Sequence, residues 1–147
     1  MKKHVVLCFA AALCSLFLSF STKRGGDSFA IFLNGKQVLQ QFVYADKSAK
    51  TLSLGPLRDN DKIEVQYSHC GRPGKDRVIT ITDEKNNLLK KLEFGDGENG
   101  SSRMVFYRRD ITAKSGTFKL FYTAKELPEG RILATIVSTE GKVVAKL

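Results

Sequence analysis

The chain has 147 residues and a formal net charge of +9, from 24 Lys+Arg against 15 Asp+Glu. Its length fits one domain, and its hydrophobic fraction of 42% is too high for a disordered chain. Its 12 glycines have no collagen period, and its 3 cysteines are too few for a disulfide scaffold.

The first 21 residues have the three parts of a secretory signal peptide. A basic start with Lys2 and Lys3 precedes an apolar run over residues 5–20, and Ser19 and Ser21 place small residues before a cut after Ser21. We therefore expect residues 1–21 to be removed and the protein to be exported, to the periplasm, the cell surface or the medium.

Two alternatives for the N-terminal segment stay open. A membrane anchor would need about 20 apolar residues, and the run over residues 5–20 is shorter than that. A lipoprotein modified at Cys14 is the other, although Leu13 is larger than the residue that normally precedes a lipidated cysteine. We expect no transmembrane segment after cleavage.

Removal of residues 1–21 would leave 22 Lys+Arg and 15 Asp+Glu, a net charge of +7, with Cys70 as the one cysteine and His69 as the one histidine. One cysteine cannot close a disulfide within the chain, so stability must come from a hydrophobic core. His69 and Cys70 are neighbours in an expected strand and would point to opposite faces, which excludes a nucleophile–base pair. One histidine and one cysteine also exclude a His/Cys zinc site within one chain.

From residue 28 onward, short apolar stretches alternate with turn signals every 8–12 residues, which predicts about nine β-strands. No amphipathic stretch is long enough for a helix of 10–15 residues. We therefore expect a flexible lead over residues 22–27 and, over residues 28–147, an all-β domain that forms a single antiparallel β-sandwich. The expected strands cover residues 28–33, 37–44, 50–54, 63–70, 77–82, 88–94, 104–108, 117–124, 131–139 and 142–147.

Three local patterns give sharper expectations. Asn34-Gly35 predicts a tight hairpin, because both residues tolerate the positive φ of a type I′ turn. Alternation over residues 88–94 places Leu88, Leu92 and Phe94 on one face. Residues 132–137 are apolar on both faces, which indicates a strand in the middle of a sheet.

One segment resembles a known fold family. Asp110 is expected to N-cap a turn of helix over Ile111–Lys114, which precedes Phe118 and Leu120. This order resembles the corner that leads into strand F of immunoglobulin-like sandwiches. Phe118 stands where the family has its corner tyrosine, and Leu120 where it has a cysteine. The resemblance implies an immunoglobulin-like or related sandwich and implies no function.

Basic residues cluster around two loops and are the candidate binding residues. Arg72, Lys75 and Arg77 lie in and after one loop, and we expect them to share one surface. Arg108 and Arg109 lie near Arg103 and Lys114 at another turn. Such clusters fit an anionic envelope or extracellular component, namely a polysaccharide, a lipid head group or an acidic protein. A solvated face that aids solubility is the alternative, and an exported protein is not expected to bind nucleic acid.

Two acidic turns are candidates for binding calcium. One holds Asp59 and Asp61, and the other holds Asp96 and Glu98. Neither has the EF-hand spacing, and such turns are ordinary between strands. We therefore expect no resident metal, no cofactor and no catalytic residue.

These observations predict a small exported binding or interaction module rather than an enzyme. One alternative is a structural or assembly subunit of a surface complex that pairs through an exposed edge strand. Another is a carbohydrate-active hydrolase with a carboxylate or calcium site.

Overall fold

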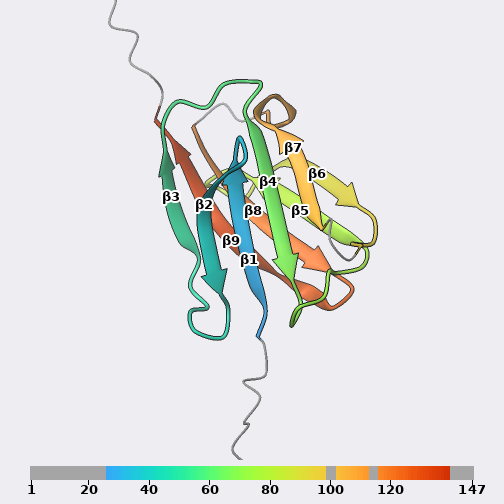
Figure 1. Cartoon of the computed structure of the whole chain (residues 1–147). Coiled ribbons are helices and arrows are strands. Elements are labelled where there is room, and N and C mark those ends of the chain that lie inside the picture. The colour runs from blue at the N-terminus through green and yellow to red at the C-terminus, as the bar shows by residue number, and fades with distance from the viewer. Residues whose placement is uncertain (1–25, 99–101, 113–115, 140–147) are drawn as a thin grey trace, which may run out of the picture.

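The computed structural model describes residues 26–98, 102–112 and 116–139, which form two β-sheets (Figure 1). One sheet has the strand order β2-β1-β4-β7, and the other has the order β3-β9-β8-β5-β6. The described residues include no α-helix, so the expected all-β class is confirmed. The strands are β1 (Ser28–Leu33), β2 (Lys36–Phe42), β3 (Lys50–Leu54), β4 (Lys62–Ser68), β5 (Arg77–Thr82), β6 (Leu88–Phe94), β7 (Arg103–Tyr107), β8 (Thr117–Ala124) and β9 (Leu127–Ser138).

The expectation of purely antiparallel pairing is wrong at one place. β3 runs parallel to β9, whereas all the other neighbouring strands pair antiparallel. The chain leaves β2 at the edge of the four-stranded sheet and crosses to the edge of the other sheet as β3 (Figure 1). A strand that changes sheets is not bound to the reversed direction that a hairpin imposes, so parallel pairing is possible there.

The core lies between the facing sides of the two sheets. Every second residue of β8 is buried, including Phe118, Leu120 and Tyr122. Tyr67 of β4 stacks on Tyr122 with ring centroids 4.4 Å apart, which joins the four-stranded sheet to the five-stranded one. The alternating pattern of the sequence therefore corresponds to one buried face on each sheet.

Two local expectations are confirmed. Asn34 and Gly35 have φ values of 51° and 83° and join β1 to β2 in a tight turn. β9 lies between β3 and β8, as its apolar residues on both faces indicated. β9 nevertheless begins at Leu127 rather than residue 131, because Gly130, with φ 70°, carries the strand through an irregular stretch of its pairing with β8.

The expected face of β6 is wrong at its first residue. Thr82 pairs with Leu88 and Ile81 pairs with Lys90, so Leu89 is an extra residue in the ladder. An extra residue reverses the alternation on one side of the bulge. Leu88 is therefore 65% exposed, while Leu89 packs against the core beside Leu92.

The helical turn expected after Asp110 is also misplaced. The turn is a 3-10 helix over Arg108–Asp110, and Asp110 closes it rather than capping its start. The Asp110 carboxylate accepts a hydrogen bond from the Tyr107 backbone N–H at 2.8 Å, so it reaches back toward β7. The physical reason is that Asp110 finds an unpaired backbone donor one turn earlier in the chain.

Several expectations fall outside the described residues: the signal peptide 1–21, residues 22–25 of the lead, Lys114, and the strand 142–147. Within the described ranges, no helix is long and apolar enough to cross a membrane.

The outer face of the four-stranded sheet holds a buried carboxylate. Glu64 is 3% exposed. Arg103 Nη1 donates to Glu64 Oε2 at 3.1 Å, and Lys62 Nζ lies 3.1 Å from Oε1. The Arg103 guanidinium also covers the Phe32 ring, 4.2 Å from its centroid. Burial raises the pKa of Glu64, but the contacts and charges of Lys62 and Arg103 outweigh burial and hold it below its ordinary value.

Glu64→Gln is expected to lower the free energy of unfolding by about 1 kcal/mol at pH 7. Because the folded-state pKa of Glu64 is lowered, its stabilising contribution is present above the pKa of the unfolded chain and is lost as pH falls through the folded-state pKa. Urea unfolding at pH 7 and at about pH 3 should therefore show a difference between wild type and variant that shrinks in acid. An equal difference at both pH values would contradict an ionised Glu64 as its source.

Candidate functional site

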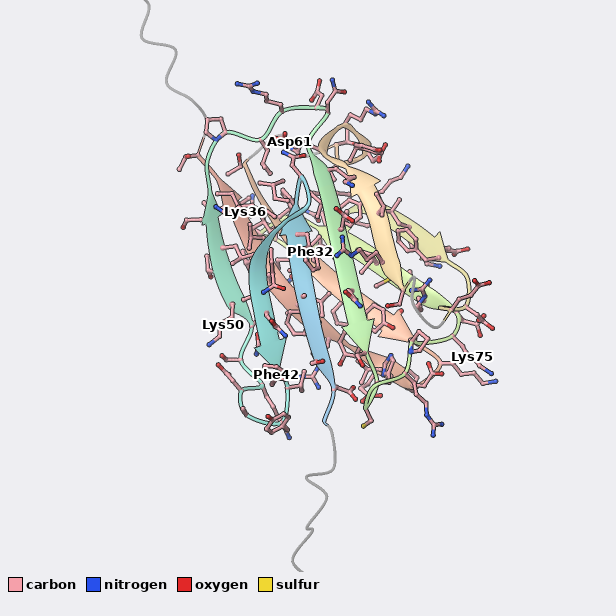
Figure 2. All side chains as sticks on the ribbon, viewed as in Figure 1. Phe32, Lys36, Phe42, Lys50, Asp61 and Lys75 are labelled. Carbon is pink, nitrogen blue, oxygen red and sulfur yellow. The ribbon has the colours of Figure 1, made fainter. Side chains whose placement is uncertain are left out.

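The two basic clusters lie at opposite ends of the sheets. Lys75 is in the β4–β5 loop at one end, and Asp61 marks the other end, where the 3-10 turn lies (Figure 2). The backbone N–H groups of Arg108 and Arg109 donate to the carbonyls of Asp61 and Asp59, which fixes the second cluster to that far end. The candidate binding residues therefore do not form one surface.

The Arg108 and Arg109 side chains are engaged within their own end of the molecule. Arg108 Nη1 donates to the Ile111 carbonyl at 2.7 Å, and Arg109 Nη1 donates to Asn60 Oδ1 at 2.9 Å. Arg109 also lies over the Tyr107 ring, 4.6 Å from its centroid. These contacts hold the 3-10 turn against the neighbouring loop.

The expectation that Arg77 shares a surface with Arg72 and Lys75 is wrong. Arg77 is 7% exposed, because strand alternation turns it to the inner face of β5. Its Nε donates to the Gly95 carbonyl at 2.9 Å and its Nη1 to the Ser102 carbonyl at 2.7 Å. Arg77 thus holds the β6–β7 loop in place from inside.

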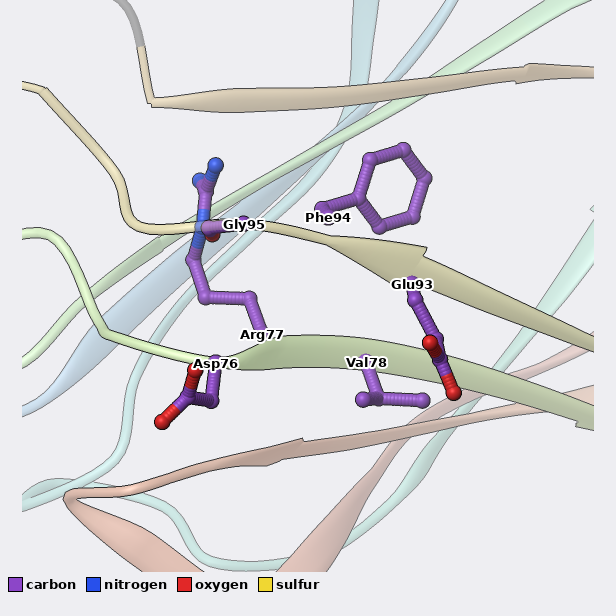
Figure 3. Close-up of a pocket in the computed structure, with 6 residues that line it drawn as sticks. All are labelled: Asp76, Arg77, Val78, Glu93, Phe94 and Gly95. Atoms are coloured by element: carbon purple, nitrogen blue, oxygen red, sulfur yellow. The ribbon is translucent and has the colours of Figure 1, made fainter.

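Figure 3 shows the surface beside this buried arginine. Asp76 and Val78 point to one side of β5 and Arg77 to the other, and Glu93 and Phe94 separate in the same way across β6. The hollow between them has a volume of about 380 Å³. Its two carboxylates and one buried guanidinium offer no exposed cation, so it does not extend the basic site.

The four calcium candidates are divided between the same two ends. Asp61 accepts hydrogen bonds from the Arg58 backbone N–H at 2.7 Å and from Asn34 Nδ2 at 2.9 Å. The hydrogen bond from Arg58 is the largest cause that holds the pKa of Asp61 below its ordinary value, and the bond from Asn34 acts in the same direction. Asp96 accepts the Asp76 backbone N–H at 3.1 Å. The described residues contain no group of three or more His, Cys, Asp or Glu side chains that could hold a metal ion.

The first cluster opens into a pocket of about 590 Å³ between the β4–β5 loop and the β8–β9 turn. Two cations of its lining, Arg72 and Lys75, were expected from the sequence, and the third, Lys125, comes from the neighbouring turn. Glu126 is the one carboxylate in the lining. The pocket is also lined by His69, Cys70 and Pro73.

A tight reversal after β4 gives the loop its shape. The backbone groups of His69 and Arg72 bond to each other in both directions, at 2.7 and 3.0 Å. Cys70 and Gly71 fill this turn with φ values of 51° and 89°. The Cys70 side chain is exposed and its thiol is free. The turn brings the Arg72 side chain to the pocket rather than into a continued strand.

Hydrogen bonds from two other loops fix the far part of the β4–β5 loop. The Gly97 N–H donates to the Gly74 carbonyl at 2.8 Å. The Lys125 N–H donates to the Lys75 carbonyl at 2.9 Å, and the Lys75 N–H donates to Glu126 Oε2 at 2.9 Å. Lys75 and Lys125 are therefore held next to each other although 50 residues separate them in the sequence.

A buried hydrogen-bonded chain lies behind the pocket. His69 Nε2 is 3.0 Å from the Tyr122 hydroxyl, and His69 Nδ1 is 3.5 Å from Asp27 Oδ2. The Tyr67 hydroxyl donates to the same Asp27 oxygen at 3.0 Å. Burial is the main cause that raises the pKa of both tyrosines, so their hydroxyls stay protonated. The protonated Tyr122 hydroxyl and the His69 ring nitrogen Nε2 share the 3.0 Å hydrogen bond, and the other ring nitrogen faces Asp27.

Close packing holds this chain in place behind the pocket. Tyr122 is fully buried, and Gly74 lies so close that an added Cβ would be 2.6 Å from the Tyr122 hydroxyl. Cys70 Sγ donates to the other oxygen of the same carboxylate, Asp27 Oδ1, at 3.7 Å. The expectation that His69 and Cys70 alternate in one strand is wrong, because β4 ends at Ser68 and Cys70 lies in the following turn with φ 51°.

Sequence reasoning missed four residues of the site. Asp27 was assigned to a flexible lead, and the sequence pattern indicated only a core position for Tyr122. Lys125 and Glu126 stood in a turn without any cluster of charge. Of these four, only Lys125 and Glu126 could have been found from the sequence, because charged residues in a connection between two strands are expected at the surface, near one end of a sheet.

Comparison of the chain with models of known protein families and with curated proteins found no match.

Proposed function

We propose that this protein is a small exported binding module that holds an anionic group of its partner in the pocket between the β4–β5 loop and the β8–β9 turn. The observation that carries the proposal is the convergence of Arg72, Lys75 and Lys125 on one pocket from two separate connections. Export is supported by the basic, apolar and small-residue pattern of residues 1–21.

The electrostatics of the pocket favour an anion. Three cations face one carboxylate, Glu126, so the lining carries a net positive charge. Two of the cations are ammonium groups and one is a guanidinium, which gives both point charges and a planar donor to the ligand. Charge-assisted hydrogen bonds of this kind are about twice as strong as neutral ones.

We further propose that the two sheets form an immunoglobulin-like sandwich. The order β9-β8-β5 matches strands G-F-C of that fold, and β1-β4-β7 matches A-B-E. On this assignment the β4–β5 loop is the B–C loop and the β8–β9 turn is the F–G loop. These two loops lie at one end of such sandwiches and bind ligands in variable domains.

Assembly through an added edge strand has less support. β6 is an edge strand with an exposed Leu88, but Lys90 and Lys91 stand in its middle. Lysines on an edge strand oppose pairing with another strand. We therefore do not propose it as a second function.

Charge reversal tests the binding proposal. Arg72→Glu with Lys75→Glu is expected to lower the salt concentration at which the protein elutes from a phosphate-bearing and from a carboxylate-bearing matrix. Lys36→Glu with Lys90→Glu is the matched control, since both lysines are exposed, lie away from the pocket and change the net charge equally. The control should elute nearer to wild type, and about 1 M salt should erase the difference, because the Debye length then falls to about 3 Å.

Equal losses from the two double variants would contradict the proposal. Retention would then follow the net charge of the chain, and the pocket would have no special part in it.

A further inference from the structure

The pocket already contains a carboxylate that is hydrogen-bonded to its wall. Glu126 Oε2 accepts the Lys75 backbone N–H at 2.9 Å, and the next residue toward the N-terminus, Lys125, donates its own N–H to the Lys75 carbonyl. The β8–β9 turn thus makes two hydrogen bonds to the backbone of Lys75, one from the Lys125 N–H and one to the Glu126 carboxylate. The carboxylate therefore occupies a backbone donor of the pocket wall.

Glu126 is held in that position by polar contacts and not by packing. Its side chain is exposed, so it can leave the pocket without opening the core. The Lys75 N–H bond is the first cause that lowers the pKa of Glu126, and the His69 and Lys75 charges act in the same direction. An exposed carboxylate on a cationic wall is a group that a competing carboxylate can replace.

An exposed aromatic pair lies at the same end of the molecule as the pocket. Phe42 and Tyr44 are 48% and 66% exposed, and their ring centroids are 6.0 Å apart. The Val43 N–H between them donates to the Asp27 carbonyl at 2.8 Å, and the Asp27 carboxylate is 3.5 Å from His69 of the pocket lining. Figure 2 shows Phe42 and Lys75 at the same end of the molecule. Exposed aromatic side chains next to charged groups are typical of surfaces that bind other proteins.

We propose that the pocket takes a side-chain carboxylate from an acidic segment of another protein, and that Glu126 occupies its place until that segment binds. This inference rests on the proposed function and names its partner. A glutamate or aspartate side chain on a partner reproduces the group that the pocket already holds. The aromatic pair then contacts the partner to one side of that carboxylate.

The test compares variants of Glu126 in binding to a labelled oligoglutamate peptide and to tripolyphosphate. Glu126→Ala frees the Lys75 N–H and removes the competing charge, and is expected to tighten peptide binding about five-fold, the effect of one displaced hydrogen bond. Glu126→Gln removes the charge but keeps an acceptor, so its gain should be smaller. Glu129→Gln is the matched control, because it removes the same charge three residues away from an exposed position outside the pocket.

The aromatic pair supplies the second arm of the test. Phe42→Ser with Tyr44→Ser should weaken binding of the peptide about three-fold or more and leave tripolyphosphate binding unchanged. A thermal unfolding midpoint near that of wild type shows that each variant is folded. The Glu126→Gln variant keeps the test decisive if Glu126→Ala loosens the turn.

The possible outcomes distinguish this inference from the proposed function, which is anion binding in the pocket. Unchanged or weaker peptide binding by both Glu126 variants, with binding still lost in Arg72→Glu/Lys75→Glu, would overturn the displaced carboxylate and leave the anion pocket standing. No effect of the aromatic variant on peptide binding would overturn the acidic protein partner. No binding of either anion to any variant would overturn both.

Discussion

Replacement of Tyr67 with alanine is expected to lower the free energy of unfolding by about 4 kcal/mol. Tyr67 is 1% exposed and is the middle member of a group of rings in contact. Its ring centroid lies 4.4 Å from that of Tyr122, 4.7 Å from that of His69 and 6.0 Å from that of Phe29. Alanine would leave a cavity between the two sheets, and the Asp27 carboxylate would lose its hydroxyl donor.

Tyr67→Phe separates the ring from the hydroxyl. It keeps the stacked surface and removes the hydroxyl's 3.0 Å bond to Asp27 and its hydrogen bond with Arg131, so a cost of about 1 kcal/mol is expected. Urea unfolding of both variants with the wild-type protein measures the two contributions. Similar costs for the two variants would show that the hydroxyl bond, and not the ring, accounts for the stability at this position.

Arg77→Met is expected to lower the free energy of unfolding by about 3 kcal/mol. The variant keeps the bulk of the side chain but leaves the carbonyls of Gly95 and Ser102 without their buried donor. Because Gly97 in the same loop packs against Pro73 of the β4–β5 loop, the loss should also loosen the pocket wall. Anion retention should therefore fall together with stability.

Arg77→Lys is the control that keeps the positive charge but not the pair of hydrogen bonds that the guanidinium makes. One ammonium cannot reach both carbonyls with the planar fork of a guanidinium, so we expect an intermediate cost. Chemical denaturation and matrix retention are measured for both variants. A methionine variant as stable as wild type would mean that water satisfies the two carbonyls and that Arg77 does not fix the loop.

The sequence was most informative where one residue type constrains its own backbone. Asn34 and Gly35 defined a hairpin because both accept positive φ, and alternation located the buried side of β8. The same alternation failed at Leu88, because a bulge adds one residue and reverses the faces beyond it. A bulge depends on how the strand pairs with its partner, so it cannot be predicted from the spacing of residues within the strand.

Arg77 shows how one pattern supports two different interpretations. Its closeness in sequence to Arg72 and Lys75 suggested a shared surface, whereas strand alternation places it on the same side as Ile79, toward the core. The structure follows the alternation, since two backbone carbonyls from the β6–β7 loop satisfy the buried guanidinium. Such partners come from residues 18 and 25 positions away, so only the folded chain could decide between the two.

The sequence by itself determined the fold class, most strand bounds and two cations of the pocket, because period-2 alternation and turn chemistry act within a few residues. Only the tertiary structure decided which loops meet. Lys125 and Glu126 reach Lys75 because β5 pairs with β8, and Asp27 reaches His69 because β1 pairs with β4. Sheet pairing of distant strands brings these charges together, and no local pattern in the chain specifies that pairing.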